Sequence, residues 1–149
     1  MIPKYLTALF ATLLVTGCVS GGTSSDQARW LQPAQAIQLA ADAAPRDVPG
    51  LFSMQVQATG EQGGEIYLNS EADYRDQRNL TVALTPAAAQ QLALRLGEPL
   101  AVALDRKRIL VRGSARRVRI DFTTAGQPTG KYYYQTHVRV TDAAQIQLQ

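Results

Sequence analysis

The sequence predicts a mainly β domain, a small barrel with one helix, and two observations lead to this expectation. After residue 50, short runs of β-branched and aromatic residues alternate with polar ones and are separated by glycine or by charged segments. Only residues 85–97 carry clear helix start and stop signals. An open antiparallel sheet with one packed helix, an α+β arrangement, is the alternative that the same pattern allows.

The N-terminal part of the chain divides into three segments. Residues 1–17 resemble a secretory signal, because Lys4 precedes an uncharged stretch from Tyr5 to Thr16 that is too short to cross a bilayer as a helix. Residues 18–29 are small and polar, and we expect a flexible tether. Residues 30–50 form an extension and connector, in which 30–41 fits either a strand or a helical turn. Residues 51–149 remain for a single β domain.

Three short strands are expected first within this domain. The segment 51–58 places Phe52, Met54 and Val56 on one face, and segments 65–69 and 79–84 are strands by residue type. The charged segment 70–78 between the last two is expected to be a surface loop held by local ion pairs.

The helix signals are specific. Thr85 is a good N-cap, Pro86 suits the first helical position, and Gly97 is a typical stop. Ala89, Leu92 and Leu96 form an apolar stripe that should face the sheet.

Strands are expected again after the helix, over 99–104, 107–122 and 131–140, with a last apolar pair in 144–149. In the long segment 107–122 the apolar residues change from odd to even numbers near Gly113 and Ser114. Because side chains alternate strictly along a strand, this change predicts a β-bulge or sharp bend at Gly113. Residues 123–130 are expected to form a loop.

This order of elements resembles the OB-fold. Three strands, a helix and then curved strands follow one another in that barrel, whose helix lies between the third and fourth strands. The resemblance covers residues 51–149 and is one of topology. It implies a sheet face that can bind oligonucleotides or oligosaccharides.

The single cysteine ends a second recognisable pattern. Val15, Thr16, Gly17 and Cys18 resemble the lipobox of bacterial lipoproteins, in which the cysteine thiol is lipidated and the signal is cut before it. The resemblance implies a membrane anchor at Cys18, with acyl chains such as palmitate, and the alternative is an ordinary secretory signal with an unmodified cysteine. Val19 is not the aspartate that retains many lipoproteins in the inner membrane, so the expected location is the outer membrane, facing the periplasm.

The residues needed for catalysis or metal binding do not form a pattern. His137 is the only histidine, no serine lies in a nucleophile motif, and one histidine with one lipidated cysteine cannot make a zinc site. A calcium loop starting at Asn69 would need glycine and glutamate where Tyr74 and Leu80 stand. We therefore expect a non-enzymatic protein without cofactor or metal.

Charge is distributed unevenly along the chain. Residues 18–104 carry five basic and nine acidic side chains, whereas residues 105–149 carry nine basic and three acidic ones. Most of the basic residues in the second part are arginines, which favour bidentate contacts with oxyanions. An anionic polymer is thus a possible partner of the C-terminal strands.

The faces of these strands follow from an assumed hairpin register. If Phe122 lies opposite Tyr132, then Val118, Ile120 and Phe122 point inward together with the even residues 132–136. The outer face then carries a predicted ligand-binding strip: Arg117, Arg119, Tyr133, Gln135, His137 and Arg139. In this register Arg117 faces His137, and its charge should lower the histidine pKa. A solvated strand face without ligand is the alternative.

Two functions are compatible with these observations. The first is a periplasmic lipoprotein of the outer membrane whose basic and aromatic sheet face binds an oligosaccharide, lipopolysaccharide or nucleic acid. The second is an accessory or structural lipoprotein that docks to a larger protein assembly of the cell envelope. An enzyme is disfavoured by the missing catalytic pattern.

Overall fold

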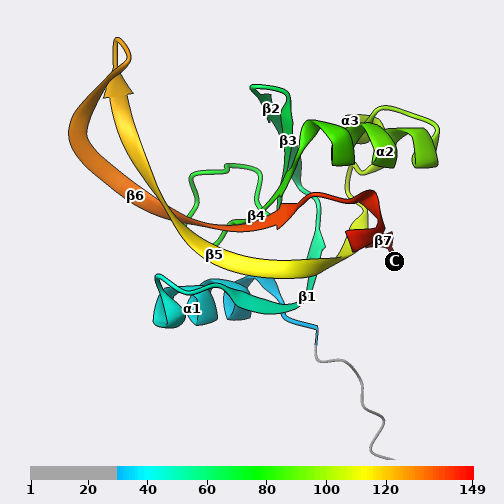
Figure 1. Ribbon diagram of the computed structural model, residues 1–149, viewed down its shortest axis with the longest axis horizontal. Coiled ribbons are helices and arrows are strands. Elements are labelled where there is room, and N and C mark those ends of the chain that lie inside the picture. The colour runs from blue at the N-terminus through cyan, green and yellow to red at the C-terminus, as the bar shows by residue number, and fades with distance from the viewer. Residues whose placement is uncertain (1–29) are drawn as a thin grey trace, which may run out of the picture.

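The computed structural model describes residues 30–149, so the signal, the tether and Cys18 lie outside the described residues. None of the helices within this part is long and apolar enough to cross a membrane. The prediction of a mainly β domain is confirmed. The elements, shown in Figure 1, are α1 (Pro33–Ala43), β1 (Val48–Gln55), β2 (Ala58–Gln62), β3 (Glu65–Asn69), β4 (Leu80–Leu84), α2 (Pro86–Leu96), α3 (Leu100–Ala103), β5 (Arg108–Thr124), β6 (Gln127–Val140), the 3₁₀ turn η1 (Ala143–Gln145) and β7 (Ile146–Leu148).

The strand order is that of an OB-fold. The sheet runs β1-β5-β6-β4-β3-β2, with β7 on the second edge of β5. The two ends of this sheet, β1 and β2, are separated in sequence only by Val56 and Gln57, so they are halves of one bent strand. The sheet therefore curls round on itself. The pair β4–β6 is parallel, whereas the other neighbours are antiparallel. The helix between the third and fourth strands of the barrel is α2, as the resemblance implied.

The core lies inside the curled sheet and is closed by helices. Phe52, Met54 and Val56 are buried, as their alternation predicted. Thr85 caps α2 by accepting a hydrogen bond from the Ala88 N–H, and Gly97 ends it in the left-handed conformation. The stripe Ala88, Ala89 and Leu92 is buried against the barrel.

Helix α1 and helix α3 were not foreseen as helices. The segment 30–41, which sequence reasoning left undecided, forms α1, and its Ala36 and Ala40 join the core beneath β1 and β5 (Figure 1). The expected strand 99–104 is instead the short helix α3, which buries Leu100 and Leu104 on one face. A run that is apolar at every position has no period of its own, so packing decides its structure.

The bulge predicted at Gly113 is wrong. The β1–β5 register continues without interruption from Gln55↔Arg108 to Val48↔Ala115, with Gly50 opposite Gly113. Ile109, Val111 and Ala115 all point into the core, and the register shift in β5 lies between Asp121 and Thr123. The apolar residues change from odd to even numbers because the later part of β5 leaves the barrel. There Val118 and Ile120, on the other face of the strand, are half-buried.

The far halves of β5 and β6 form a projecting ribbon, here called the arm, from residues 116–124 and 127–135. The pairing of β1 with β5 ends at Ala115, and that of β4 with β6 begins at Thr136, so both described edges of the arm are unpaired. Its tip is a tight turn in which Ala125 and Gly126 have φ of 49° and 77°, where a longer loop 123–130 was expected. In Figure 1 the arm rises on the same side of the barrel as β2 and β3.

Candidate functional site

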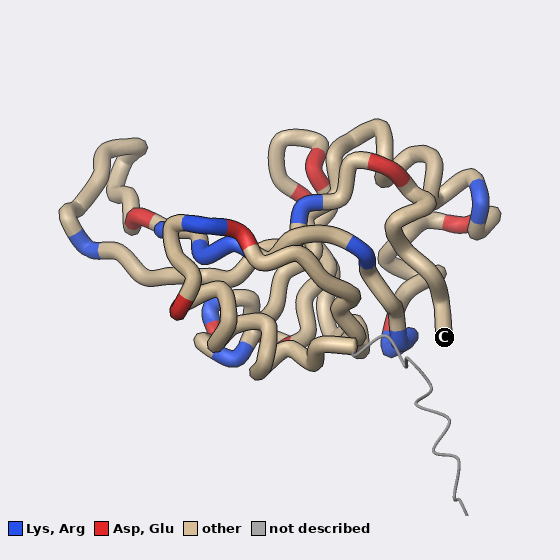
Figure 2. Tube along the Cα trace, turned by 60° about the horizontal axis from the view of Figure 1, so that its bottom comes forward, with Lys and Arg blue, Asp and Glu red and all other residues tan. Residues whose placement is uncertain are grey.

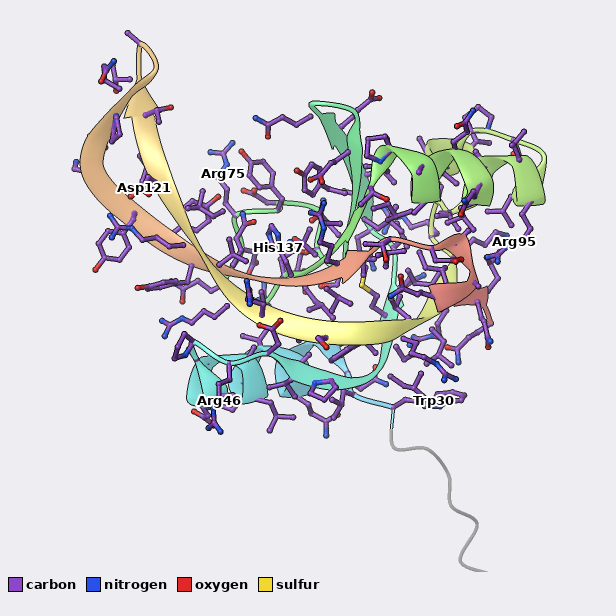
Figure 3. The ribbon with its side chains drawn as sticks, viewed as in Figure 1. Trp30, Arg46, Arg75, Arg95, Asp121 and His137 are labelled. Atoms are coloured by element: carbon purple, nitrogen blue, oxygen red, sulfur yellow. The ribbon has the colours of Figure 1, made fainter. Side chains whose placement is uncertain are left out.

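A groove of about 580 Å³ lies on the outer face of the barrel, between the β2–β3 hairpin, the loop 70–79 and the base of the arm. In Figure 3, His137 lies close to the loop that carries Arg75, and Asp121 lies farther out on the arm. The groove is lined by aromatic, amide and hydroxyl side chains with two carboxylates and, among the described residues, by no lysine or arginine: Gly60, Glu61, Gln62, Tyr67, Asn69, Tyr74, Thr81, Ile120, Asp121, Thr123, Tyr133, Gln135 and His137.

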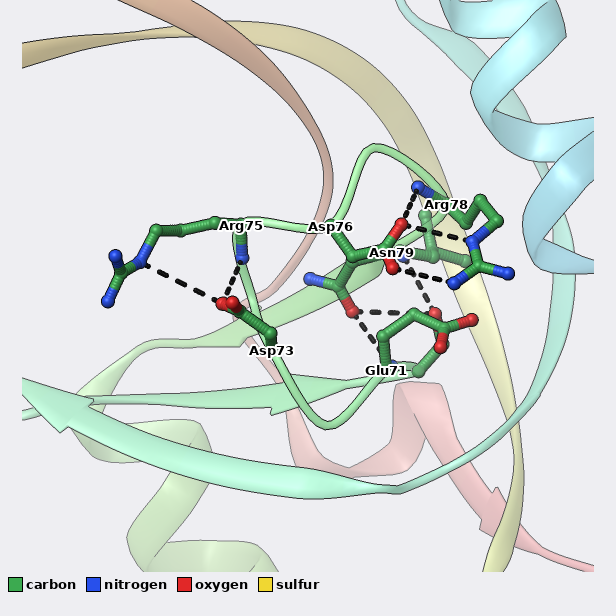
Figure 4. Close-up of polar contacts among 8 residues, drawn as sticks. Glu71, Asp73, Arg75, Asp76, Arg78 and Asn79 are labelled. Atoms are coloured by element: carbon green, nitrogen blue, oxygen red, sulfur yellow. Dashed lines mark hydrogen bonds and ion pairs between the residues drawn. The ribbon is translucent and has the colours of Figure 1, made fainter.

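The loop that forms one wall is shaped by its own charged residues. Asp73 accepts a hydrogen bond from the Arg75 N–H at 2.9 Å, and Asp76 accepts one from the Arg78 N–H at 2.8 Å. The Arg78 guanidinium also contacts both carboxylate oxygens of Asp76, at 3.1 and 2.8 Å (Figure 4). These hydrogen bonds lower the pKa of Asp76 to about 2. The expectation of a surface loop held by local ion pairs is therefore confirmed.

Buried polar residues form the floor of the groove. Asn69, Asn79 and Thr81 are 5%, 2% and 2% exposed. Asn79 Nδ2 donates to Asn69 Oδ1 at 3.0 Å and to Thr81 Oγ1 at 2.9 Å, and Thr81 Oγ1 donates to Asn69 Oδ1 at 3.0 Å. Asn79 Oδ1 accepts the Glu71 N–H at 3.0 Å, which ties the floor to the loop. Such a network is rigid because each buried group is held by several partners.

Alternate residues of β6 form a second hydrogen-bonded row in the groove. His137 Nε2 lies 2.7 Å from Gln135 Oε1. Gln135 Nε2 donates to the Tyr133 hydroxyl at 2.8 Å and to the Tyr74 carbonyl at 3.2 Å. The Tyr74 carbonyl also accepts from Asn79 Nδ2 at 3.3 Å, so one carbonyl joins the row to the floor.

Three titrating groups of the groove have pKa values shifted toward their neutral forms: Tyr67, Tyr133 and His137. Burial lowers the pKa of His137, and the nearby Glu65 carboxylate opposes this only in part. Burial raises the pKa of Tyr67, whose hydroxyl also donates to Glu65 Oε2 at 3.0 Å. Burial likewise raises the pKa of Tyr133. The groove thus offers neutral donors and acceptors beside the Glu61 carboxylate.

The six residues of the predicted strip are divided between two faces. Tyr133, Gln135 and His137 do line one groove. Arg139 follows them along β6, outside the groove lining, and pairs with Glu65 at 3.0 Å. Arg117 and Arg119 lie on the opposite face of the ribbon, because the observed register sets Arg117 opposite Thr136 and Arg119 opposite Tyr134.

The assumed register was wrong by one residue, which inverts one strand relative to the other. His137 faces Arg116, and burial, not Arg117, is the main cause of its lowered pKa. Val118 and Ile120 consequently share a face with Gln135 and Tyr133, and Tyr132 and Tyr134 are 50% and 41% exposed on the arm.

Arginines and tyrosines stack on that opposite face. The Arg117 guanidinium lies 3.8 Å from the centre of the Tyr134 ring, and that of Arg119 lies 4.1 Å from the centre of Tyr132. Arg119 is also paired with Asp121 at 2.7 Å. Figure 2 shows that basic and acidic positions are interspersed over the whole chain trace, so the charge asymmetry of the sequence does not become a single basic face.

Several residues of the groove were missed by sequence reasoning. Glu61, Tyr67, Asn69, Tyr74 and Thr81 come from segments that meet Gln135 and His137 only in the folded chain. The available signal was polar residues inside otherwise apolar strands, at Asn69 and Thr81. Within residues 30–149 no three histidine, cysteine or acidic side chains are grouped as metal ligands would be.

Comparisons with known proteins give only distant likenesses. No family model and no curated protein matches the sequence. A crystal structure described as an aspartyl-tRNA synthetase from Leishmania major Friedlin aligns at 12% identity and a TM-score of 0.42, over 85% of this chain and 22% of that one. An aspartyl-tRNA synthetase from Entamoeba histolytica aligns at 10% identity and a TM-score of 0.43, over 98% and 26% of the two chains. This chain spans under a third of either enzyme, and likeness of this degree says nothing about what it binds.

Proposed function

We propose that this protein is a non-enzymatic binding module that holds an oligosaccharide in the groove on the outer face of its barrel. The observation that supports this most is the groove lining, in which tyrosines and a neutral histidine alternate with amide and hydroxyl groups. OB barrels use this face of the sheet for extended polymers.

The chemistry of the lining favours sugar over nucleic acid. A sugar ring presents apolar C–H groups that can lie on an aromatic ring, and hydroxyl groups that donate to carboxylates and amides. Glu61 in the wall would attract such hydroxyls but repel phosphates, whereas the Asp121 carboxylate is paired with Arg119 on the opposite face of the arm. Single-stranded nucleic acids are bound in basic grooves, whereas among the described residues no lysine or arginine lines this groove, and Arg139, the next outer-face residue along β6, pairs with Glu65.

A second candidate function rests on the opposite face of the arm. Arg117 over Tyr134 and Arg119 over Tyr132 place guanidinium groups beside exposed rings, an arrangement that suits phosphates and stacked bases. An anionic polymer, either nucleic acid or lipopolysaccharide, would bind there and not in the groove.

We also propose that the module is anchored to the outer membrane by lipid on Cys18 and faces the periplasm. The lipobox pattern and Val19 support this. Docking of the protein to a larger assembly of the cell envelope stays the alternative function.

The test measures binding of two probes to the full-length protein purified in detergent. We expect calorimetric titration to show binding of chitotetraose, a tetramer of N-acetylglucosamine, that Tyr133→Ala weakens by about 1–3 kcal/mol if a ring stacks there, by analogy with base stacking. The double variant Arg117→Glu/Arg119→Glu should leave this binding unchanged.

The second probe is a ten-nucleotide oligothymidylate, with a charge-matched control variant. Arg46→Glu/Arg108→Glu changes the net charge equally at two exposed positions away from both faces. Arg95 is unsuited as a control, because its guanidinium donates to the Ala143 and Ile146 carbonyls at 3.1 and 2.7 Å. Oligothymidylate binding that only the Arg117/Arg119 reversal abolishes, without binding of chitotetraose, would refute the oligosaccharide proposal in favour of the second candidate.

A further inference from the structure

Asn69 has an amide whose orientation is fixed but whose nitrogen is unused. The residue is 5% exposed and lines the groove. Its Oδ1 accepts from both Asn79 Nδ2 and Thr81 Oγ1, and within residues 30–149 its Nδ2 has no hydrogen-bond partner. Because no side-chain nitrogen or oxygen in this part of the chain is both fully buried and unpartnered, this Nδ2 must remain accessible. The accessible side of Asn69 is the groove.

The orientation of this amide follows from backbone groups. The Glu71 N–H can only donate, so the Asn79 atom that it contacts must be Oδ1. Asn79 Nδ2 then faces Asn69 and can only donate, so the Asn69 atom there must be Oδ1. Rotating the Asn69 amide by half a turn would place its Nδ2 against Asn79 Nδ2, so that two donors would face each other. The Nδ2 of Asn69 is therefore held toward the groove as a donor.

The Tyr133 hydroxyl is made a donor in the same way. The Tyr74 carbonyl can only accept, so the Gln135 atom that contacts it must be Nε2. This nitrogen also donates to the Tyr133 hydroxyl at 2.8 Å. The tyrosine oxygen is thus already an acceptor within the protein, and its own hydrogen is left for a ligand. His137 supports the arrangement, since its Nε2 contacts Gln135 Oε1 at 2.7 Å and must carry the hydrogen.

We infer that the Asn69 Nδ2 and the Tyr133 hydroxyl are each positioned to donate to an uncharged group that only accepts hydrogen bonds, namely a carbonyl oxygen of the ligand. A phosphate or carboxylate also only accepts, but the Glu61 carboxylate in the lining would repel it. A hydroxyl can also accept these hydrogen bonds, but its own hydrogen then needs a separate acceptor, which a carbonyl oxygen does not. In an oligosaccharide the group that fits is the acetamido carbonyl of an N-acetylated sugar. This inference rests on the proposed function and specifies its ligand.

The experiment compares two sugars of equal length on the full-length protein, chitotetraose with acetamido groups and cellotetraose without them. A site built to hydrogen-bond a group discriminates strongly against an analogue that lacks it, because its buried donor is then left unsatisfied. We expect chitotetraose to bind at least about tenfold more tightly, since one buried hydrogen bond accounts for roughly this factor. The affinity ratio of the two sugars is the readout that a purely structural role of Asn69 would not change.

Two variants test the two donors. Asn69→Asp keeps an oxygen for Asn79 and Thr81 and replaces the donor with an acceptor, and Tyr133→Phe removes the hydroxyl but keeps the ring. Each should bring the affinity ratio toward one, mainly by weakening chitotetraose. Gln90→Ala, at an exposed position of α2 outside the groove lining, is the control and should keep the ratio.

The outcomes separate the inference from the function on which it rests. Equal affinity of the unaltered protein for both sugars, or an unchanged ratio in Tyr133→Phe, overturns the carbonyl selection and leaves the oligosaccharide function in place. Binding of neither sugar overturns the proposed function itself. If Asn69→Asp does not fold, the ratio in Tyr133→Phe decides.

Discussion

At the scale of single residues, His137 shows how burial and one hydrogen bond define a chemical role. Its pKa is lowered mainly because burial disfavours the charged imidazolium. Its Nε2–H can then donate to Gln135 while the ring stays neutral. His137, predicted from the sequence as part of an outer strip, is therefore one member of the hydrogen-bonded row that lines the groove.

This shift predicts a pH-dependent stability. The unfolded chain binds a proton at His137 near the ordinary value of 6.5, whereas the folded chain binds it only at lower pH. The unfolded state thus holds more protons between the two values, and the free energy of unfolding falls as pH drops below 6.5 and levels off below the folded pKa. Urea denaturation at a series of pH values measures this.

His137→Gln is the matched control for the pH series, because glutamine keeps a side-chain N–H but does not titrate. The variant should lose this part of the pH dependence. A folded-state pKa of His137 at or above 6.5, measured by NMR titration, would contradict the role assigned to burial.

At the scale of secondary-structure elements, close packing of strands explains a glycine that looked like a bend. Gly113 does not have a positive φ, and a Cβ built on it would lie 2.8 Å from Cγ1 of the buried Val138. Strand β5 must pass close to β6 at the point where the β1 pairing ends and the arm begins. The glycine provides the space for this crossing.

Gly113→Ala should lower the free energy of unfolding by about 1–3 kcal/mol, because the added methyl group overpacks the core against a stiff valine. Adding Val138→Ala should recover part of the loss, so that the double variant is more stable than the two single effects predict. Gly60→Ala is the control, since no atom lies within 4 Å of its Cβ position. Equal unfolding midpoints of Gly113→Ala and Gly60→Ala would show that a methyl group fits beside Val138 and would contradict this prediction.

At the scale of the whole molecule, the groove and the arm belong to one domain. Its described part begins a short distance in sequence after Cys18, the proposed anchor. The described chain starts at Trp30, whose labelled position in Figure 3 lies on the other side of the barrel from the arm. A module tethered near Trp30 would turn its groove away from the attachment point, where a long polymer could reach it.

The anchor itself predicts a change in location. We expect the native protein to incorporate radiolabelled palmitate and to fractionate with the outer membrane, whereas Cys18→Ser should stay unlabelled and uncleaved. Val19→Asp is the control and should keep the label but move to the inner membrane, as the lipoprotein resemblance implies. Palmitate labelling of the Cys18→Ser protein would disprove lipidation at this residue.

The sequence by itself determined the features that depend on neighbours in the chain. The cap at Thr85, the stop at Gly97, the alternation of Phe52, Met54 and Val56 and the ion pairs of the loop 70–79 are local, and each is confirmed. The side-by-side order of Tyr133, Gln135 and His137 on one face also follows from alternation along a single strand.

Only the tertiary structure decided which segments meet. Pairing between β5 and β6 depends on a register that the apolar pattern of a half-exposed ribbon specifies weakly, and a shift of one residue moved Arg117 and Arg119 to the other face. The groove needs Asn69, Asn79 and Thr81 from strands and loops far from His137 in sequence. Their contact follows from the curling of the whole sheet, which brings β3 and β4 beside β6, and no local pattern encodes it.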